Sequence, residues 1–201
     1  MRRVVMVARY LVAAAMLLAV AWSLARSING GSFNFFNFFG YFTIQNNLIG
    51  AAALLFAVPY TGRERPPWIE YLRACAATYL FIVVTVYWTL LAPTTTDPIV
   101  EWTNLVLHGL SGLALVTDWL IEGPRRTLPL RNVWLVLLYP CVWAVVVLIR
   151  GATDGWFPYP FLDPAKGYDG IAVVIAAIFV AGLVVGSMFF KTTRWRVVTP
   201  A

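Results

Sequence analysis

Six long apolar stretches constrain the fold of this chain more than any other feature of its sequence. Each is bounded by charged residues, Pro or Gly, and each has close to the ~20 apolar residues that a membrane-spanning helix needs. The stretches cover residues 4–25, 38–60, 72–91, 101–121, 133–149 and 170–190. The sequence therefore predicts an all-α protein, a polytopic membrane domain of six transmembrane helices that occupies residues 1–201.

The composition supports a membrane protein and excludes a soluble fold. Charged residues make up 12% of the chain, whereas soluble domains carry roughly 25%. The apolar residues form uninterrupted runs, unlike the alternating pattern of a transmembrane β-barrel. The first run follows Met1-Arg2-Arg3 as in a signal peptide, but it is longer than a signal core of about 7 to 15 residues. We therefore expect it to be a retained span.

The Lys and Arg residues predict the orientation of the bundle. Twelve of the 15 fall on one side of the predicted spans, which is typical of cytoplasmic loops. These are Arg2, Arg3, Arg9, Arg63, Arg65, Arg73, Arg125, Arg126, Arg131, Lys191, Arg194 and Arg196, and the other side has Arg26, Arg150 and Lys166. Both termini are expected to be cytoplasmic, in the plasma (inner) membrane. The same bias explains the net charge of +6, so no nucleic-acid partner is expected.

Two connections on the predicted outer side are rich in aromatic residues. Residues 30–40 alternate Phe with Asn, and residues 155–164 combine three prolines with Trp, Phe and Tyr. A water-exposed linker of this kind would present a large apolar patch, so both segments are expected at the membrane interface. They are either interfacial anchors or a lid over a cavity that opens outward.

Polar residues inside two of the spans are the strongest functional signal. Thr43, Gln45, Asn46 and Asn47 lie in the outer third of the second span. Polar groups within a membrane are expensive and usually face the interior of the bundle. We therefore expect this cluster to face inward.

The fourth span carries a second polar set. Asn104, His108 and Ser111 are spaced by four and three residues, which places them on one face of a regular α-helix. His108 is the only histidine of the chain. At a rise of 1.5 Å per residue, Thr43 and His108 lie roughly 7 and 10 Å below the outer ends of their spans. They share a level in the membrane, and a pair that acts together requires about 3 Å between the hydroxyl and the imidazole.

Several chemistries are not expected from this sequence. One His and two separated Cys do not form a recognisable metal-ligand set, so neither a metal nor another cofactor is expected. No Gly-x-Ser-x-Gly elbow occurs, since the second glycine of 109–113 comes one place early. No phosphate-binding glycine loop or dinucleotide fingerprint is present either.

Short motifs of the chain resemble the androgen-induced-gene family of integral membrane proteins. The matching residues are Tyr41-Phe42-Thr43, Asn46, Asn104, His108, Trp156 and Tyr159-Pro160-Phe161-Leu162. The resemblance implies a six-helix threonine hydrolase that cleaves fatty acid esters of hydroxy fatty acids. It also implies Thr43 as the nucleophile, His108 as its base, and a membrane lipid or acyl ester as the substrate.

An ester hydrolase also needs donors for the oxyanion and residues that bind substrate. The candidates are Gln45, Asn46, Asn47, Asn104, Ser111, Trp156, Tyr159 and Phe161. The alternative is a non-catalytic scaffold or lipid-binding protein, in which the polar cluster serves packing. A small-solute transporter is favoured less, because no broken helices or paired repeats are evident. The G-x-x-x-G pattern of 182–186 permits helix packing within or between chains, so the oligomeric state stays open.

Overall fold

The computed structural model describes residues 1–94, 101–124 and 126–193, and the regular structure of this part of the chain is helical, without β-strands. The α-helices are α1 (Arg2–Asn29), α2 (Phe35–Phe38), α3 (Phe42–Ala57), α4 (Pro67–Val86), α5 (Trp102–Leu105), α6 (Ser111–Ile121), α7 (Leu135–Thr153) and α8 (Tyr168–Thr192). Shorter 3-10 turns cover Val58–Tyr60, Ala92–Thr94, Leu130–Asn132, Pro160–Leu162 and Pro164–Lys166. The all-α prediction is confirmed.

Six helical segments among the described residues are long and apolar enough to cross a membrane, as the sequence predicts. They are Arg2–Asn29, Phe42–Tyr60, Pro67–Leu91, Trp102–Ile121, Leu130–Thr153 and Tyr168–Thr192. Most are longer than the predicted spans, because the helices continue past the first charged residue at their ends. Charged residues therefore mark the ends of the apolar part of each span, but the helix itself extends beyond them.

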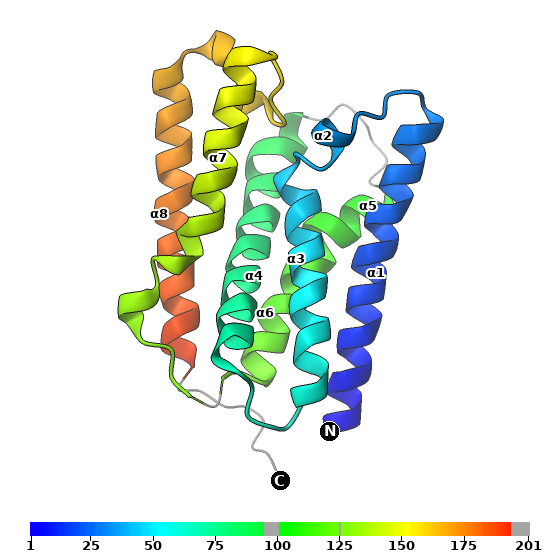
Figure 1. The fold of residues 1–201 in the computed structure, drawn as a ribbon, viewed down its shortest axis with the longest axis vertical. Helices are drawn as coiled ribbons and strands as arrows, with labels where there is room; N and C mark the ends of the chain where they lie inside the picture. Colours follow the sequence, from blue (N-terminus) through cyan, green and yellow to red (C-terminus); the bar gives the residue numbers. More distant parts are fainter. Residues whose placement is uncertain (95–100, 125, 194–201) are drawn as a thin grey trace.

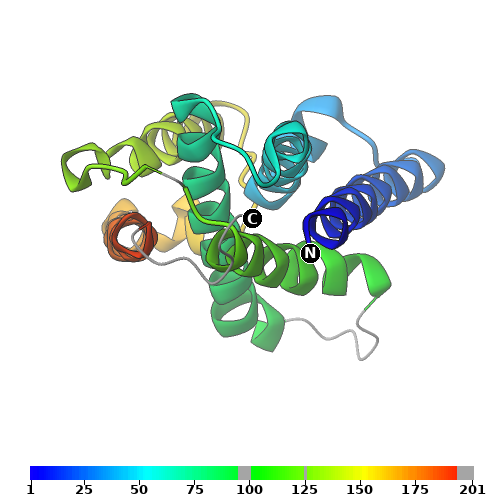
Figure 2. The same ribbon diagram turned by 90° about the horizontal axis from the view of Figure 1, so that it is seen from below.

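The helices form an upright bundle (Figure 1). The start of α1 and the end of α8 lie at the lower end in Figure 1, while α2 and the connection between α7 and α8 lie at the upper end. Helix α3 packs between α1 and α4, and α6 packs against α4 and α1. Helices α7 and α8 pair with each other on the side of α4 away from α1 (Figure 2).

Small residues let α3 and α6 pack closely against their neighbours. A Cβ on Gly50 of α3 would lie 2.6 Å from Leu80 and 2.8 Å from Met16. A Cβ on Gly112 of α6 would lie 2.9 Å from the backbone oxygen of Leu80. Close backbone approach of this kind stabilises helix pairs in a membrane, where apolar surface has no preference for protein over lipid. The middle of the bundle is a packed apolar layer that also includes Leu115.

The second span begins later than the sequence predicts, at Phe42 rather than at residue 38. Phe35–Phe38 form the separate helix α2, and the chain turns at Gly40. The Gly40 carbonyl accepts a hydrogen bond from the indole of Trp143, and a Cβ at Gly40 would meet the ring of Trp156 at 2.4 Å. The expected depth of Thr43 is corrected accordingly: it lies in the first turn of α3.

Two helices change to a π-helical turn at the upper end of the bundle. Tyr87–Leu91 extends α4 in this form, and Val106–Leu110 joins α5 to α6. A π turn holds one more residue than an α turn, and such turns occur often at functional sites. The two turns lie beside each other: the indole nitrogen of Trp88, in the first turn, donates a 2.8 Å hydrogen bond to the carbonyl of His108, in the second.

The charged residues divide between the two ends of the bundle as the sequence predicts, within the described residues. Arg26 pairs with Glu101, and Arg150 with Asp154, at the upper end. Three of the arginines used to predict the orientation lie outside the described residues: Arg125, Arg194 and Arg196.

Candidate active site

A cleft of about 400 Å³ opens at the upper end of the bundle. Helix α3, the two π turns and the connection after α7 all contribute to it. Its lining residues are Phe38, Tyr41, Thr43, Ile44, Tyr87, Leu91, Leu107, His108, Pro158, Tyr159 and Pro160. We call this space the cleft. Thr43 and His108 both line it, so the structure brings the two principal candidates of the sequence analysis together.

Thr43 and His108 are in contact across the cleft. The Thr43 hydroxyl Oγ1 lies 3.2 Å from Nε2 of His108, although the two residues are 65 positions apart in the chain. The second and fourth spans therefore face each other at this level of the bundle. The separation is within the range at which a base accepts the proton of a nucleophile, which is about 2.6–3.2 Å.

The imidazole of His108 is oriented by stacking. Its ring lies parallel to the ring of Tyr87, with centroids 3.9 Å apart and an interplanar angle of 17°. The Tyr87 hydroxyl in turn accepts a 2.9 Å hydrogen bond from the side chain of Asn104. Nδ1 of His108 is buried, and no carboxylate among the described residues pairs with it. An aromatic ring therefore takes the orienting place that a carboxylate holds in Ser-His-Asp sites.

Tyr159 completes a chain of hydrogen bonds with Thr43. The backbone N–H of Thr43 donates to the Tyr159 hydroxyl at 3.3 Å, and the same hydroxyl lies 3.4 Å from Thr43 Oγ1. The first N–H groups of a helix have no partner within the helix, so this contact also caps α3. Burial raises the pKa of the Tyr159 phenol, which favours its neutral form, able to donate a proton.

The amide side chains are committed elsewhere. The NH₂ group of Asn46 donates to the carbonyl of Phe42 at 2.7 Å, and that of Asn47 donates to the carbonyls of Thr43 and Leu107 at 2.9 and 3.2 Å. Both side chains are completely buried and neither lines the cleft. The bond of Asn47 to Leu107 holds α3 to the π turn that carries His108, whereas the bond of Asn46 lies within α3.

Gln45 and Ser111 point away from the pair. Gln45 donates to the carbonyl of Phe39 and accepts from the hydroxyl of Tyr139 on α7. Ser111 is buried and donates to the carbonyl of Leu107 at 3.1 Å. The expectation that Ser111 shares a face with His108 assumed a regular α-helix, and the π turn between them shifts the phase. Of Asn104, His108 and Ser111, only His108 lines the cleft.

The aromatic residues of the connection after α7 divide between two roles. Phe161 stacks on Tyr159 with centroids 5.3 Å apart, which supports the hydroxyl that reaches Thr43. Trp156 instead packs beside Tyr41 and against the guanidinium of Arg150, 4.1 Å from the ring centroid. Trp156 therefore closes the upper end near Gly40 but does not line the cleft.

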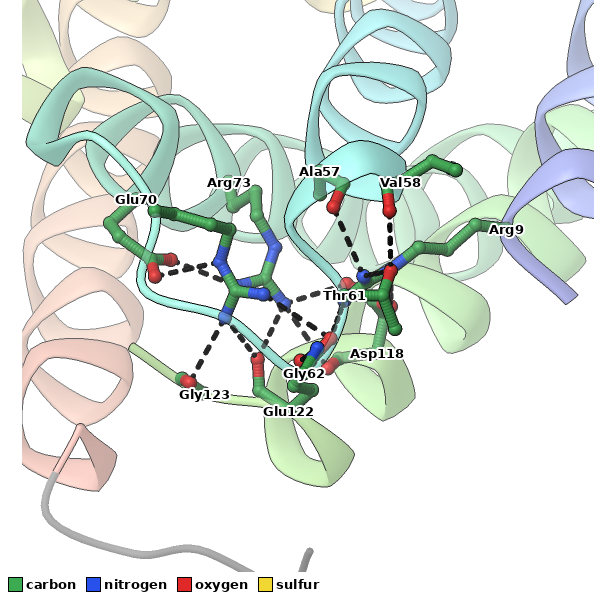
Figure 3. Close-up of polar contacts among 11 residues, drawn as sticks. Arg9, Ala57, Val58, Thr61, Gly62, Glu70, Arg73, Asp118, Glu122 and Gly123 are labelled. Atoms are coloured by element: carbon green, nitrogen blue, oxygen red, sulfur yellow. Dashed lines mark hydrogen bonds and ion pairs between the residues drawn. The ribbon is translucent and has the colours of Figure 1, made fainter. Parts of the chain in front are cut away.

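A second polar cluster, at the lower end, was not predicted as a unit (Figure 3). Three arginines and three carboxylates alternate in a closed ring, each group paired with two of opposite charge at 2.6 to 3.2 Å. In order around the ring they are Arg9, Asp118, Arg73, Glu70, Arg65 and Glu122. We call this the charge ring. It joins α1, α4, α6 and the connection after α3.

The sequence holds a signal for the charge ring. The three carboxylates Glu70, Asp118 and Glu122 lie within or beside the apolar stretches on the arginine-rich side, where an unpaired charge is costly. Three arginines are available to pair with them, but the two members of a pair lie up to 109 positions apart in the chain. These arginines were used only to predict the orientation of the bundle, so their role in holding the helices together was missed.

Among the described residues, no group of three or more His, Cys, Asp or Glu is placed to hold a metal ion. Comparison with known proteins adds nothing to this geometry: no protein-family model matches the chain, and no curated protein or solved structure does.

Proposed function

We propose that this protein is an integral membrane ester hydrolase with Thr43 as nucleophile and His108 as general base. The observation that carries the proposal is the 3.2 Å contact between Thr43 Oγ1 and His108 Nε2 at the wall of an apolar cleft. A threonine hydroxyl is a weak nucleophile at neutral pH, and a neutral imidazole within hydrogen-bond reach activates it. The resemblance to the androgen-induced-gene family supports the same pair and favours a lipid ester as substrate.

The reaction follows from the positions of the two groups. As Thr43 Oγ1 attacks the ester carbonyl, its proton passes to Nε2 of His108. The bond between the carbonyl carbon and the alcohol oxygen then breaks, and His108 returns the proton to that oxygen. The acyl group stays on Thr43 until a water molecule, deprotonated by His108, attacks the acyl carbon. The bond from that carbon to Thr43 Oγ1 then breaks, His108 returns the proton to Oγ1, and the fatty acid is released. Each proton taken up by the imidazole is therefore returned within one turnover.

Tyr159 is the donor best placed for the oxyanion. Its hydroxyl accepts from the Thr43 N–H and so has its own proton to donate, 3.4 Å from the nucleophile. The positive end of the α3 dipole adds to this stabilisation, since Thr43 lies in the first turn. The amides of Asn46 and Asn47 take no part, because their NH₂ groups bond backbone carbonyls.

The orientation of the protein also belongs to the proposal. The arginine-rich lower end faces the cytoplasm, with both termini, and the cleft opens near the outer surface of the plasma (inner) membrane. A transporter is disfavoured by the apolar layer of Met16, Leu80 and Leu115, which separates the cleft from the charge ring.

Labelling by a fluorophosphonate probe tests the proposal. The purified protein is expected to react covalently, Thr43→Ser to retain labelling because it keeps a hydroxyl, and Thr43→Val to lose it while keeping the side-chain shape. Thr78→Val is the matched control, because Thr78 is a buried threonine that only bonds the carbonyl of Ala74. Labelling of Thr43→Val at the wild-type level would favour the non-catalytic lipid-binding protein instead.

A further inference from the structure

The cleft has an uncharged lining. It consists of apolar side chains, three tyrosines, Thr43 and His108, and none of the described residues that line it is an Asp, Glu, Lys or Arg. Residues 95–100, outside the described part of the chain, contain no Lys or Arg either. The volume of about 400 Å³ lies in the range of small-molecule sites, which is room for an ester group and the atoms next to it.

The two arginines at the upper end of the bundle already have carboxylate partners. Arg26 pairs with Glu101, and Arg150 pairs with Asp154 at 2.8 Å. Neither arginine lines the cleft. Their charges are therefore compensated outside it and are not directed toward a group bound at Thr43.

Lys166 is the third basic residue of the predicted outer side. Its ammonium donates a 2.8 Å hydrogen bond to the carbonyl of Pro160, a residue that lines the cleft. Lys166 itself is exposed and is not a lining residue. Water and salt screen an exposed charge, so it contributes little to the binding of an anion inside the cleft. Its contribution can be measured by substitution.

A charged group on the substrate would lose its hydration inside this cleft. The transfer of an ionised carboxylate or phosphate from water to apolar surroundings is strongly unfavourable unless a partner of opposite charge is present. In a glycerophospholipid only two carbon atoms separate the nearer ester oxygen from the phosphate ester. A phospholipid ester that reached Thr43 would therefore bring its phosphate into the cleft.

We propose that the substrate is an ester with no charged group near the scissile bond, an inference that rests on the proposed function. Neutral glycerides and esters of simple alcohols belong to this class, and glycerophospholipids do not. An ester of a hydroxy fatty acid belongs to it only when its free carboxylate is far enough from the ester to stay outside the cleft. With this selectivity a hydrolase can work in a phospholipid bilayer without cleaving the lipids around it.

A matched pair of soluble esters tests the effect of charge at constant size. The full-length protein in detergent is given 4-(hexanoyloxy)butanoate or 4-(hexanoyloxy)butanamide, which differ only in a carboxylate against an isosteric carboxamide, and release of hexanoate is measured. We expect kcat/KM to be at least about tenfold higher for the amide. Dihexanoylglycerol should likewise be preferred to its 3-phosphate. Equal values for the carboxylate and the amide overturn the inference, while Thr43-dependent hydrolysis stands.

Tyr41→Arg adds a cation to the lining and has a matched control in Phe36→Arg. Both residues are exposed aromatics at the same end of the bundle, but Tyr41 lines the cleft and Phe36 does not. Tyr41→Arg is expected to raise kcat/KM for the carboxylate about tenfold relative to the amide, and Phe36→Arg to leave the ratio unchanged. The same ratio in both variants overturns the inference. If Tyr41→Arg is inactive on both esters, the wild-type ratio decides.

Lys166→Ala tests the cation nearest to the rim. The ratio of the two esters should stay at the wild-type value, because this ammonium is exposed. A wild-type preference for the carboxylate that is lost in Lys166→Ala would assign anion binding to Lys166 and overturn the inference. If neither ester is cleaved in a Thr43-dependent way, the proposed function fails together with the inference.

Discussion

The cleft and the charge ring are both polar regions inside an apolar bundle, but they differ in how their groups are paired. In the charge ring every arginine and carboxylate has two partners of opposite charge. At the cleft, no carboxylate among the described residues pairs with His108, and Thr43 Oγ1 lies at the wall of the cleft beside His108 and Tyr159. Breaking one pair of a buried ring leaves its partners without a counter-charge and destabilises the bundle, while polar groups at the wall of a cleft are accessible to a substrate.

The comparison predicts that the charge ring carries stability. In Arg73→Met, Glu70 and Asp118 each lose a buried partner, which should reduce the free energy of unfolding by about 3–5 kcal/mol. Denaturant unfolding in detergent measures this. Arg26→Met is the control, since its pair with Glu101 is exposed and is worth at most about 1 kcal/mol. Equal losses in the two variants would remove the distinction between the ring and an ordinary surface pair.

The cleft, by contrast, should carry activity. Tyr159→Phe keeps the ring that stacks on Phe161 but removes the oxyanion donor, so kcat should fall about 100-fold with stability nearly unchanged. Tyr41→Phe is the control, because Tyr41 lines the cleft but its hydroxyl is not among the groups that bond Thr43. A similar fall in both variants would count against Tyr159 as the donor.

The pH dependence of hydrolysis sharpens the same contrast. Acidification should lower kcat/KM about tenfold per pH unit once His108 is protonated, because an imidazolium cannot accept the proton of Thr43. On the alkaline side, burial raises the pKa of Tyr159, so the phenol stays a donor up to about pH 10, the ordinary value for tyrosine, and beyond it. Above about pH 10, the Tyr159 phenol loses its proton in the unfolded chain but keeps it in the folded protein, so the free energy of unfolding should decrease. Rates that stay constant on acidification would exclude His108 as the base.

The smallest effect is expected on the stability of the cleft variants. A hydrogen bond between side chains in a membrane is typically worth about 0.6 kcal/mol, so Thr43→Val should unfold almost like the wild type. The same unfolding measurement as for Arg73→Met gives the comparison directly. A loss of several kcal/mol in Thr43→Val would make the pair structural.

The sequence predicts those parts of this protein that depend on local composition. Apolar runs reveal the six spans, and the two sets of polar residues single out Thr43 and His108, but their contact is not determined by the sequence. The position of Trp156 and its packing against Gly40 cannot be predicted from the sequence. Hydropathy does not distinguish the separate helix α2 from the start of the second span.

Other features depend on contacts that span the chain. The π turns at Tyr87–Leu91 and Val106–Leu110 have no hydropathy signal, yet they determine that His108 reaches the cleft and Ser111 does not. The charge ring joins Arg9 to Asp118 across 109 positions. The bond of Asn47 to the carbonyl of Leu107 likewise depends on the approach of α3 to the second π turn. None of these pairings follows from residue spacing.

A double-mutant cycle on hydrolysis of a short, soluble ester tests whether Thr43 and His108 act as one unit. We expect Thr43→Val and His108→Ala each to lower kcat/KM at least about a thousandfold, and the double variant to be hardly worse than either, since groups that act together are strongly non-additive. Thr43→Ser should keep part of the activity. Losses that multiply in the double variant, or a fully active Thr43→Val, would contradict the account.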